Sequence, residues 1–363
     1  MTEHNEIIKK RIFEKNSLAG IKLENRIIRA ATHEGMSDAD GYPSADLTEL
    51  YERLAKGGVG AIITGFAGVE RRGKPLANML MIDDDAHVES FKRMNQALKP
   101  YGVPLIMQIA HGGGKSDPSV TGEMTAAPSA LRYPVPSGMA RELTHAEIGE
   151  IIECFVYAIL RAKKAGFAGV ELHAAHGYLL SQFLSPAMNR RNDMWGGSTE
   201  NRFRIIGEII RRAREKARDY PILMKYSAYD GDKNGMRLDE AIVIAKLFEN
   251  AGGGALEISC GGVNDGAYPL RFEKPPVKAL FSINPVLKNM PWLKKKMIML
   301  LMSLTYRSPE PLHDYNLDAA REIKKHVNIP VIVVGGIRNL DTIERIITEE
   351  TADYVSLSRP LVI

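Results

Sequence analysis

Short apolar runs alternate along the chain with amphipathic stretches, and this alternation predicts the fold. Eight runs are rich in β-branched residues and mostly apolar throughout, as parallel strands buried on both faces should be. They are residues 26–31, 61–66, 104–110, 169–173, 221–227, 255–259, 330–335 and 354–358. The stretches between them place apolar residues at the spacing of helices that bury one face.

Capping signals support the helices. Thr144 and Glu147 form a capping-box pattern before an apolar periodic segment, and Asn339 stands where a helix through Ile343 would begin. Residues 202–217 alternate apolar positions with arginines, which is typical of a helix on the outside of a barrel. Eight strand–helix units predict a (β/α)8 TIM barrel that forms one domain over residues 1–363.

The alternative fold is a doubly wound open sheet, which would place a Gly-x-Gly-x-x-Gly turn after the first strand, and residues 30–35 lack it. Two stretches interrupt the repeat. Residues 112–138 predict a long loop or small hairpin over the barrel mouth, and residues 262–317 predict a longer loop of the kind that forms lids or binding elements. The chain stops just past the eighth strand, so we expect the eighth outer helix and any tail to be missing.

Composition narrows the class of protein. The chain has 363 residues, of which 45% are hydrophobic and 25% charged, as in ordinary globular enzymes. A net charge of +4 from scattered basic residues argues against a nucleic-acid partner and for a small-molecule substrate, and leaves a homo-oligomer open. The longest apolar stretch, 297–304, is too short to span a membrane. Cys154 and Cys260 fit no metal-ligand pattern, which predicts a cytoplasmic protein without a metal site.

Candidate chemistry begins at the end of the fourth strand, where His173, His176 and Tyr178 fall within six residues. Neutral imidazoles and a phenol can donate hydrogen bonds, so the cluster suits binding an oxygen and delivering a proton. The alternative is a pair of histidines that fasten a loop to the barrel. The tyrosine and the position at a strand end favour the functional interpretation.

A phosphate site is expected after strands seven and eight, where this fold often holds phosphate. Gly335 and Gly336 follow the seventh strand, and Ser358 and Arg359 follow the eighth. Glycines let a phosphate approach backbone N–H groups, and an arginine supplies a bidentate cation. The alternative is that the glycines only make a tight turn and that the arginine pairs with a surface carboxylate.

Three other strand ends carry candidates: Gly65 with Phe66 on the second, Gln108 on the third and Lys225 on the fifth. A lysine within an apolar strand is costly unless paired, so Lys225 is expected to face a polar or anionic ligand, the alternative being that it reaches solvent. The run at 112–116, Gly-Gly-Gly-Lys-Ser, resembles the end of a Walker A loop but lacks the first glycine, which argues against a nucleotide triphosphatase.

Taken together, these motifs resemble the old yellow enzyme family, and most closely the bacterial NADH:flavin oxidoreductases related to 2,4-dienoyl-CoA reductase. The most specific matches are residues 173–186, His-Ala-Ala-His-Gly-Tyr-Leu-Leu-Ser-Gln-Phe-Leu-Ser-Pro, and the Asn-Arg-Arg-x-Asp-x-Trp-Gly-Gly-Ser segment that begins at Asn189. The resemblance covers residues 25–359. It implies a barrel with non-covalent FMN that is reduced by NAD(P)H and reoxidised by the activated alkene of an α,β-unsaturated carbonyl.

The resemblance also implies roles for individual residues. His173 and His176 would hold the carbonyl oxygen, and Tyr178 would protonate the α-carbon. Gln108 would meet the pyrimidine edge of the flavin, and Lys225 would lie near its N1 and O2, where the family more often has arginine. The residues expected to contact FMN are Ala30, Ala31, Thr32, Gly65, Phe66, Gln108, Lys225, Gly335, Gly336, Ser358 and Arg359.

Besides Lys225, the chain departs from the family pattern in three places. His33 lies next to Thr32, where members often place a flavin-tuning cysteine or threonine, so its role is open. The cysteine cluster of the dienoyl-CoA reductase branch is absent from the residues given, and 262–317 matches no family motif. The rival interpretations are another flavin barrel, such as a dihydroorotate dehydrogenase or a dihydrouridine synthase, and a non-catalytic flavin protein whose 295–304 segment docks on a partner or membrane surface.

Overall fold

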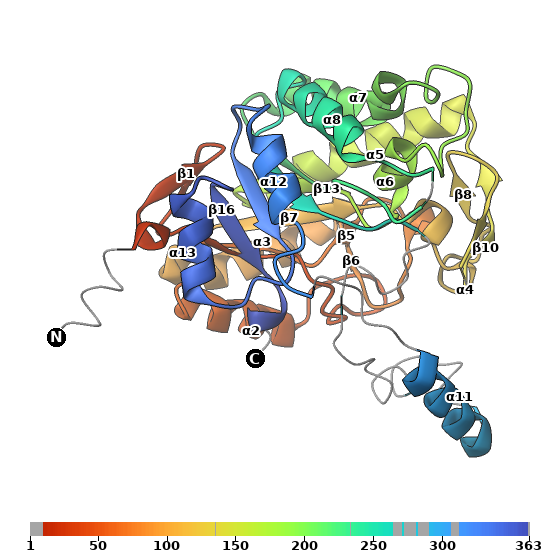
Figure 1. Ribbon diagram of the computed structural model, residues 1–363, viewed down its shortest axis with the longest axis horizontal. Helices are drawn as coiled ribbons and strands as arrows, with labels where there is room; N and C mark the ends of the chain where they lie inside the picture. Colours follow the sequence, from red (N-terminus) through yellow and green to blue (C-terminus); the bar gives the residue numbers. More distant parts are fainter. Residues whose placement is uncertain are drawn as a thin grey trace.

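A computed structural model describes residues 10–134, 136–232, 234–263, 271, 281, 290–305 and 312–361. Eight parallel strands form a closed barrel: β3 (Ile27–Arg29), β4 (Ala61–Ile63), β7 (Leu105–Ala110), β12 (Gly169–Ala174), β13 (Ile222–Ser227), β14 (Ala255–Ser259), β15 (Val331–Val334) and β16 (Tyr354–Leu357). Each strand pairs with the next along the chain, and β16 pairs with β3, which closes the ring. The (β/α)8 prediction is confirmed, and the open sheet is excluded (Figure 1).

Outer helices surround the strands. In the part of the chain that the structure describes they are α2 (Ala45–Lys56), α3 (His87–Leu98), α5 (His145–Lys164), α7 (Thr199–Ala217), α8 (Leu238–Asn250), α12 (Leu317–Lys324) and α13 (Leu340–Thr348). The capping box before α5 is present, because the hydroxyl of Thr144 accepts from the amide of Glu147 and the Glu147 carboxylate accepts from the amide of Thr144. The side chain of Asn339 caps α13 by accepting from the amide of Thr342 at 2.8 Å.

A short hairpin closes the N-terminal end of the barrel. Strands β1 (Asn16–Leu18) and β2 (Ile21–Leu23) bury Leu18, Ile21 and Leu23 against the apolar side chains that fill the barrel interior. Burying each large apolar side chain stabilises the fold by roughly 1.5–3 kcal/mol. This end is therefore a packed core, and the C-terminal mouth remains for chemistry. In Figure 1 the hairpin and the lobe that carries β8 and β10 lie at opposite sides of the molecule.

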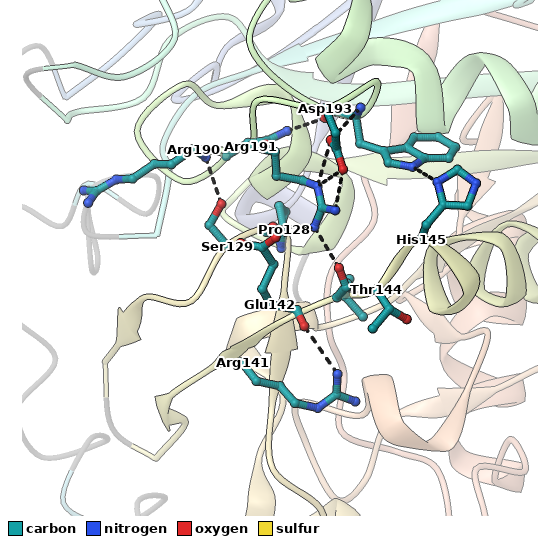
Figure 2. Close-up of polar contacts among 12 residues, drawn as sticks. Pro128, Ser129, Arg141, Glu142, Thr144, His145, Arg190, Arg191 and Asp193 are labelled. Atoms are coloured by element: carbon teal, nitrogen blue, oxygen red, sulfur yellow. Dashed lines mark hydrogen bonds and ion pairs between the residues drawn. The ribbon is translucent and has the colours of Figure 1, made fainter.

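The lobe after β7 contains the hairpin that the sequence predicted. Strand β9 (Arg132–Tyr133) pairs antiparallel with β10 (Gly138–Met139), and β8 (Ala126–Ala127) pairs parallel with β11 (Arg141–Glu142). Arg191 holds this lobe in place: Figure 2 shows it beside Pro128 and paired with Asp193. Its guanidinium donates to the backbone oxygens of Pro128 and Leu143, at 3.1 and 2.7 Å. The Asn-Arg-Arg-x-Asp motif thus supports the mouth from outside.

Several of the remaining elements are short. They are the helices α4 (Pro118–Thr121) and α6 (Leu179–Leu184), the strands β5 (Ala67–Gly68) and β6 (Leu80–Met81), and the 3-10 turns η1 (Arg11–Phe13), η2 (Arg71–Gly73), η3 (Lys99–Tyr101), η4 (Gly113–Lys115) and η6 (Arg359–Leu361). No helix in the described residues is long and apolar enough to cross a membrane.

Two sequence predictions need correction. The second barrel strand ends at Ile63 instead of residue 66, because the amide of Gly65 donates to the hydroxyl of Tyr51 at 3.0 Å and so leaves the sheet ladder. The predicted loop 262–317 contains helix α11 (Trp292–Thr305), which stands apart from the barrel in Figure 1. Much of the rest of that stretch, including residues 264–270, 272–280, 282–289 and 306–311, lies outside the described residues.

Candidate active site

The C-terminal ends of the barrel strands line a cavity of about 430 Å³, which is within the range of small-molecule sites. Every sequence candidate except Gly65 lines it: Ala30, Ala31, Thr32, Phe66, Gln108, His173, His176, Tyr178, Lys225, Gly335, Gly336, Ser358 and Arg359. A more open groove of about 610 Å³ lies near the N-terminal ends of the strands, beside Lys22 and Pro104. None of the candidate residues lines that groove.

His173, His176 and Tyr178 meet at one wall of the cavity. The ring centres of His173 and His176 are 5.2 Å apart, and those of His173 and Tyr178 are 4.8 Å apart. His176 has a left-handed backbone (φ 58°), which lets the chain turn sharply between the two imidazoles. Its Nε2 lies 2.8 Å from the hydroxyl of Ser259, which orients the ring. Nδ1 of His173 is buried and has no hydrogen-bond partner among the described residues, so it is available to a ligand.

Burial sets the protonation of this cluster. It lowers the pKa of His173 well below the usual range and that of His176 to about 3, and the charges of Lys225 and Lys115 act in the same direction. Both imidazoles are therefore neutral at physiological pH. Burial raises the pKa of Tyr178 to about 12, so its phenol keeps its proton. The wall thus presents uncharged hydrogen-bond donors.

Two buried glutamates lie below the cavity floor. Nζ of Lys225 is 3.2 Å from Oε2 of Glu257 on β14 and 4.0 Å from Oε2 of Glu171 on β12. The Gln108 amide donates to Glu171 at 2.6 Å, and the Ser356 hydroxyl donates to Glu257 at 2.5 Å. Burial and the neighbouring charge of Glu257 raise the pKa of Glu171. Lys225 lines the cavity, but its charge is balanced inside the barrel, which the sequence did not predict.

Gly65 lies behind the cavity wall. Its amide donates to the hydroxyl of Tyr51, which in turn donates to Oε1 of Glu34 at 3.1 Å. A Cβ on Gly65 would overlap the Glu34 carboxylate, so the position requires glycine for packing. Burial raises the pKa of Glu34 to about 7, although Arg29 lies 3.6 Å away and opposes the shift.

The opposite end of the cavity is rich in donors. Gly335 and Gly336 both have positive φ angles, 134° and 75°, so the turn after β15 needs glycine. Ser358 Oγ is 2.8 Å from the Thr32 hydroxyl, and the Arg359 guanidinium lines the same end of the cavity. The two glycines therefore make the tight turn that was considered as the alternative to a phosphate site, and they also line the cavity.

Comparison with known proteins decides the family. A model described as the NADH:flavin oxidoreductase / NADH oxidase family matches residues 11–262, well over half of the chain. The chain belongs to this family. The resemblance inferred from the His-x-x-His-x-Tyr cluster and its companion motifs is confirmed, and the cofactor of the family is FMN, with NAD(P)H as the reductant.

Relatives in this family differ in length. The NADH oxidase of Thermoanaerobacter brockii is 37% identical over 355 residues, which cover 97% of this chain and 49% of that protein. The NADPH dehydrogenase of Clostridium acetobutylicum is 32% identical over 353 residues, which cover 97% of this chain and 91% of that protein. The chain spans about half the length of the Thermoanaerobacter protein and of the metal reductase of Desulforamulus reducens, with which it shares 30% identity.

Solved structures share the fold. An old yellow enzyme homologue from Zymomonas mobilis aligns with a TM-score of 0.76 at 23% identity, over 97% of this chain and 89% of that one. A 2-naphthoyl-CoA reductase complex aligns with a TM-score of 0.80 at 24% identity, over 96% of this chain and 50% of that one.

The cavity of this family member fits FMN by the chemistry of its walls. The flavin ring, which carries both hydrogen-bond donors and acceptors, would meet the amide of Gln108 and the ammonium of Lys225. The phosphate would meet the donors near Gly335 and Gly336.

The cavity is also lined by residues for which the sequence predicted no site role: Lys115, Ser259, Tyr315, Ile337, Arg338 and Ser356. Glu171 and Glu257 were missed as well, although a charged residue within an apolar strand was the signal that drew attention to Lys225.

Proposed function

We propose that this chain passes hydride from NAD(P)H, through FMN, to the activated C=C bond of an α,β-unsaturated carbonyl or a similar electrophile. The observation that carries the proposal is the wall of neutral donors, His173, His176 and Tyr178, facing the same cavity as Gln108 and Lys225. Because the chain spans only about half of some relatives, the activity is proposed for this barrel and not for a longer protein.

The cofactor would occupy the cavity through residues on six of the strand ends. FMN, when bound, accepts hydride from NAD(P)H and delivers it to the β-carbon of the acceptor. Gln108 and Lys225 would hold its pyrimidine edge, and Gly335, Gly336, Ser358 and Arg359 its phosphate. Ala30, Ala31, Thr32 and Phe66 would flank the ring, whereas Gly65 would act only by letting this wall pack closely.

His173 and His176 would donate hydrogen bonds to the carbonyl oxygen of the acceptor. Negative charge builds on that oxygen as hydride reaches the β-carbon, so the two hydrogen bonds strengthen in the transition state. Tyr178 would then transfer its phenolic proton to the α-carbon. A phenol with a raised pKa holds its proton until the enolate-like carbon accepts it, which suits a general acid.

Stopped-flow kinetics of Tyr178→Phe tests the proposal, because reduction by NAD(P)H needs no acid at carbon whereas alkene reduction does. We expect flavin reduction to stay near the wild-type rate and reoxidation by an enone to slow roughly 10²–10⁴-fold. Quinones should be less affected, since their oxygens can be protonated by solvent. Tyr133→Phe is the matched control, because Tyr133 is buried on β9 and does not line the cavity.

Equal loss of both half-reactions in Tyr178→Phe would mean that Tyr178 shapes the pocket and donates no proton.

A small-molecule substrate and a cytoplasmic location belong to the same proposal. The location is supported by the absence of a disulfide between Cys154 and Cys260, the two cysteines of the chain.

A further inference from the structure

Lys115 places an ammonium group in the wall of the cavity. It ends η4, and it lines the cavity together with the histidines and Tyr178. Its Nζ donates to the backbone oxygen of His176 at 3.0 Å and lies 4.9 Å from the centre of the Tyr178 ring. The carbonyl dipole and the ring face both favour the cation, but neither carries a negative charge.

No carboxylate of the described residues lies within 4.0 Å of this ammonium, which distinguishes Lys115 from the other lysine of the cavity. Lys225 has Glu257 at 3.2 Å and Glu171 at 4.0 Å. Burial lowers the pKa of Lys115. A desolvated cation without a counter-ion costs free energy, and an anionic ligand would offset that cost.

The loop before Lys115 is built to bring it to this position. Gly113 has a positive φ of 58°, and its amide donates to Nδ1 of His111 at 3.0 Å. The amide of Gly114 donates to the side chain of Gln182 at 3.0 Å, and a Cβ there would overlap the ring of Tyr133. The three glycines thus serve close packing of the turn, and the following lysine is held at the substrate wall.

We propose that Lys115 binds a carboxylate carried by the acceptor beside its activated alkene, so that the substrates of this site are anionic, such as 4-oxo-2-enoates. This inference rests on the proposed function, in which the acceptor carbonyl lies on the histidine pair. Since the centre of the Tyr178 ring lies 4.8 Å from that of His173 and 4.9 Å from the Lys115 ammonium, one small molecule can reach all three groups. The other ligand that could bring an anionic oxygen to Lys115 is the dinucleotide of NAD(P)H.

The test uses two phenols, 4-hydroxybenzoate, which is an anion at pH 7, and its methyl ester, which is neutral. Each is titrated into the FMN-loaded oxidised protein at pH 7, and binding is followed by the change in flavin absorbance. In Lys115→Met we expect affinity for the acid to fall about 10- to 100-fold, as for loss of a charge-assisted hydrogen bond, and affinity for the ester to change little. Lys115→Arg should retain most of the preference for the acid, and Lys22→Met, at an exposed lysine, is the control.

A second arm measures the dissociation constants of NADH and NADPH from the concentration dependence of flavin reduction. They should be unchanged in Lys115→Met. If Lys115→Met binds the dinucleotides more weakly but keeps the wild-type ratio of affinities for acid and ester, Lys115 binds the dinucleotide and the proposal is overturned. An equal loss of affinity for the acid and for the ester would also overturn it. If neither phenol binds the wild-type protein, the histidine pair of the proposed function fails, and this inference falls with it.

Discussion

The neutral state of His176 can be tested through its effect on stability. His176→Asn keeps a side-chain donor at this position but removes the titrating ring. The substitution suits the backbone, because His176 has a left-handed φ of 58° and asparagine tolerates this conformation better than most residues.

The expected effect follows from the folded pKa of about 3, which burial holds below the usual value of about 6.5. Between these values the unfolded chain binds a proton that the folded chain does not, so stability rises with pH across this window. At pH 7.5 the histidine costs almost nothing. A pH of 5.0 lies about 1.5 units below the pKa of the histidine in the unfolded chain. Protonation therefore stabilises the unfolded state by about 2 kcal/mol at this pH.

Urea unfolding of the FMN-saturated protein at pH 5.0 and 7.5 measures this difference. The wild type should lose about 2 kcal/mol more than His176→Asn on going to pH 5.0. His326→Asn, at a partly exposed histidine near the end of α12, controls for removal of a histidine as such. If the wild type and His176→Asn lose the same free energy, His176 is not held neutral by burial, and the description of the donor wall is wrong.

Two further substitutions test other parts of the cavity. Arg359→Ala should lower FMN occupancy, read from the ratio of flavin to protein absorbance, while circular dichroism shows a folded barrel; full occupancy would remove Arg359 from the phosphate site. Glu34→Gln should gain stability over the wild type as pH rises from about 4.5 to 7, by about 3 kcal/mol at most, because the buried carboxyl with a pKa of about 7 resists the ionisation that the unfolded chain permits. Urea unfolding across this pH range measures the gain, and a constant difference would contradict the raised pKa.

Much of the site could be predicted because strand ends converge in this fold. Gln108, Lys225 and the His173–Tyr178 cluster are far apart in the sequence, yet each lies within an apolar run or at its end, and parallel strands bring their C-terminal ends to one mouth. Gly335 and Arg359 were found by the same rule. These positions could be predicted from the apolar runs alone, because each run is visible in the sequence without knowing which strands pair.

The residues that were missed depend on contacts between strands. Glu171 and Glu257 each lie in a run whose other residues are mostly apolar. Only the pairing of β12, β13 and β14 brings the two glutamates close to Lys225. Lys115 was considered only as part of a failed phosphate-loop motif, since its placement over Tyr178 follows from the packing of Gly113 and Gly114. Gly65 was predicted to contact the cofactor; in the structure it is not among the residues that line the cavity, and its amide donates to the hydroxyl of Tyr51.

The central claim is that one cavity serves both a hydride donor and an enone. The most direct measurement is an anaerobic titration of the FMN-loaded protein followed by its visible spectrum. NADH or NADPH should bleach the yellow colour, and an enone added without oxygen should restore it, with one saturated carbonyl product formed per flavin. A protein that takes up no FMN, or that bleaches but is not reoxidised by any enone tested, would contradict the account.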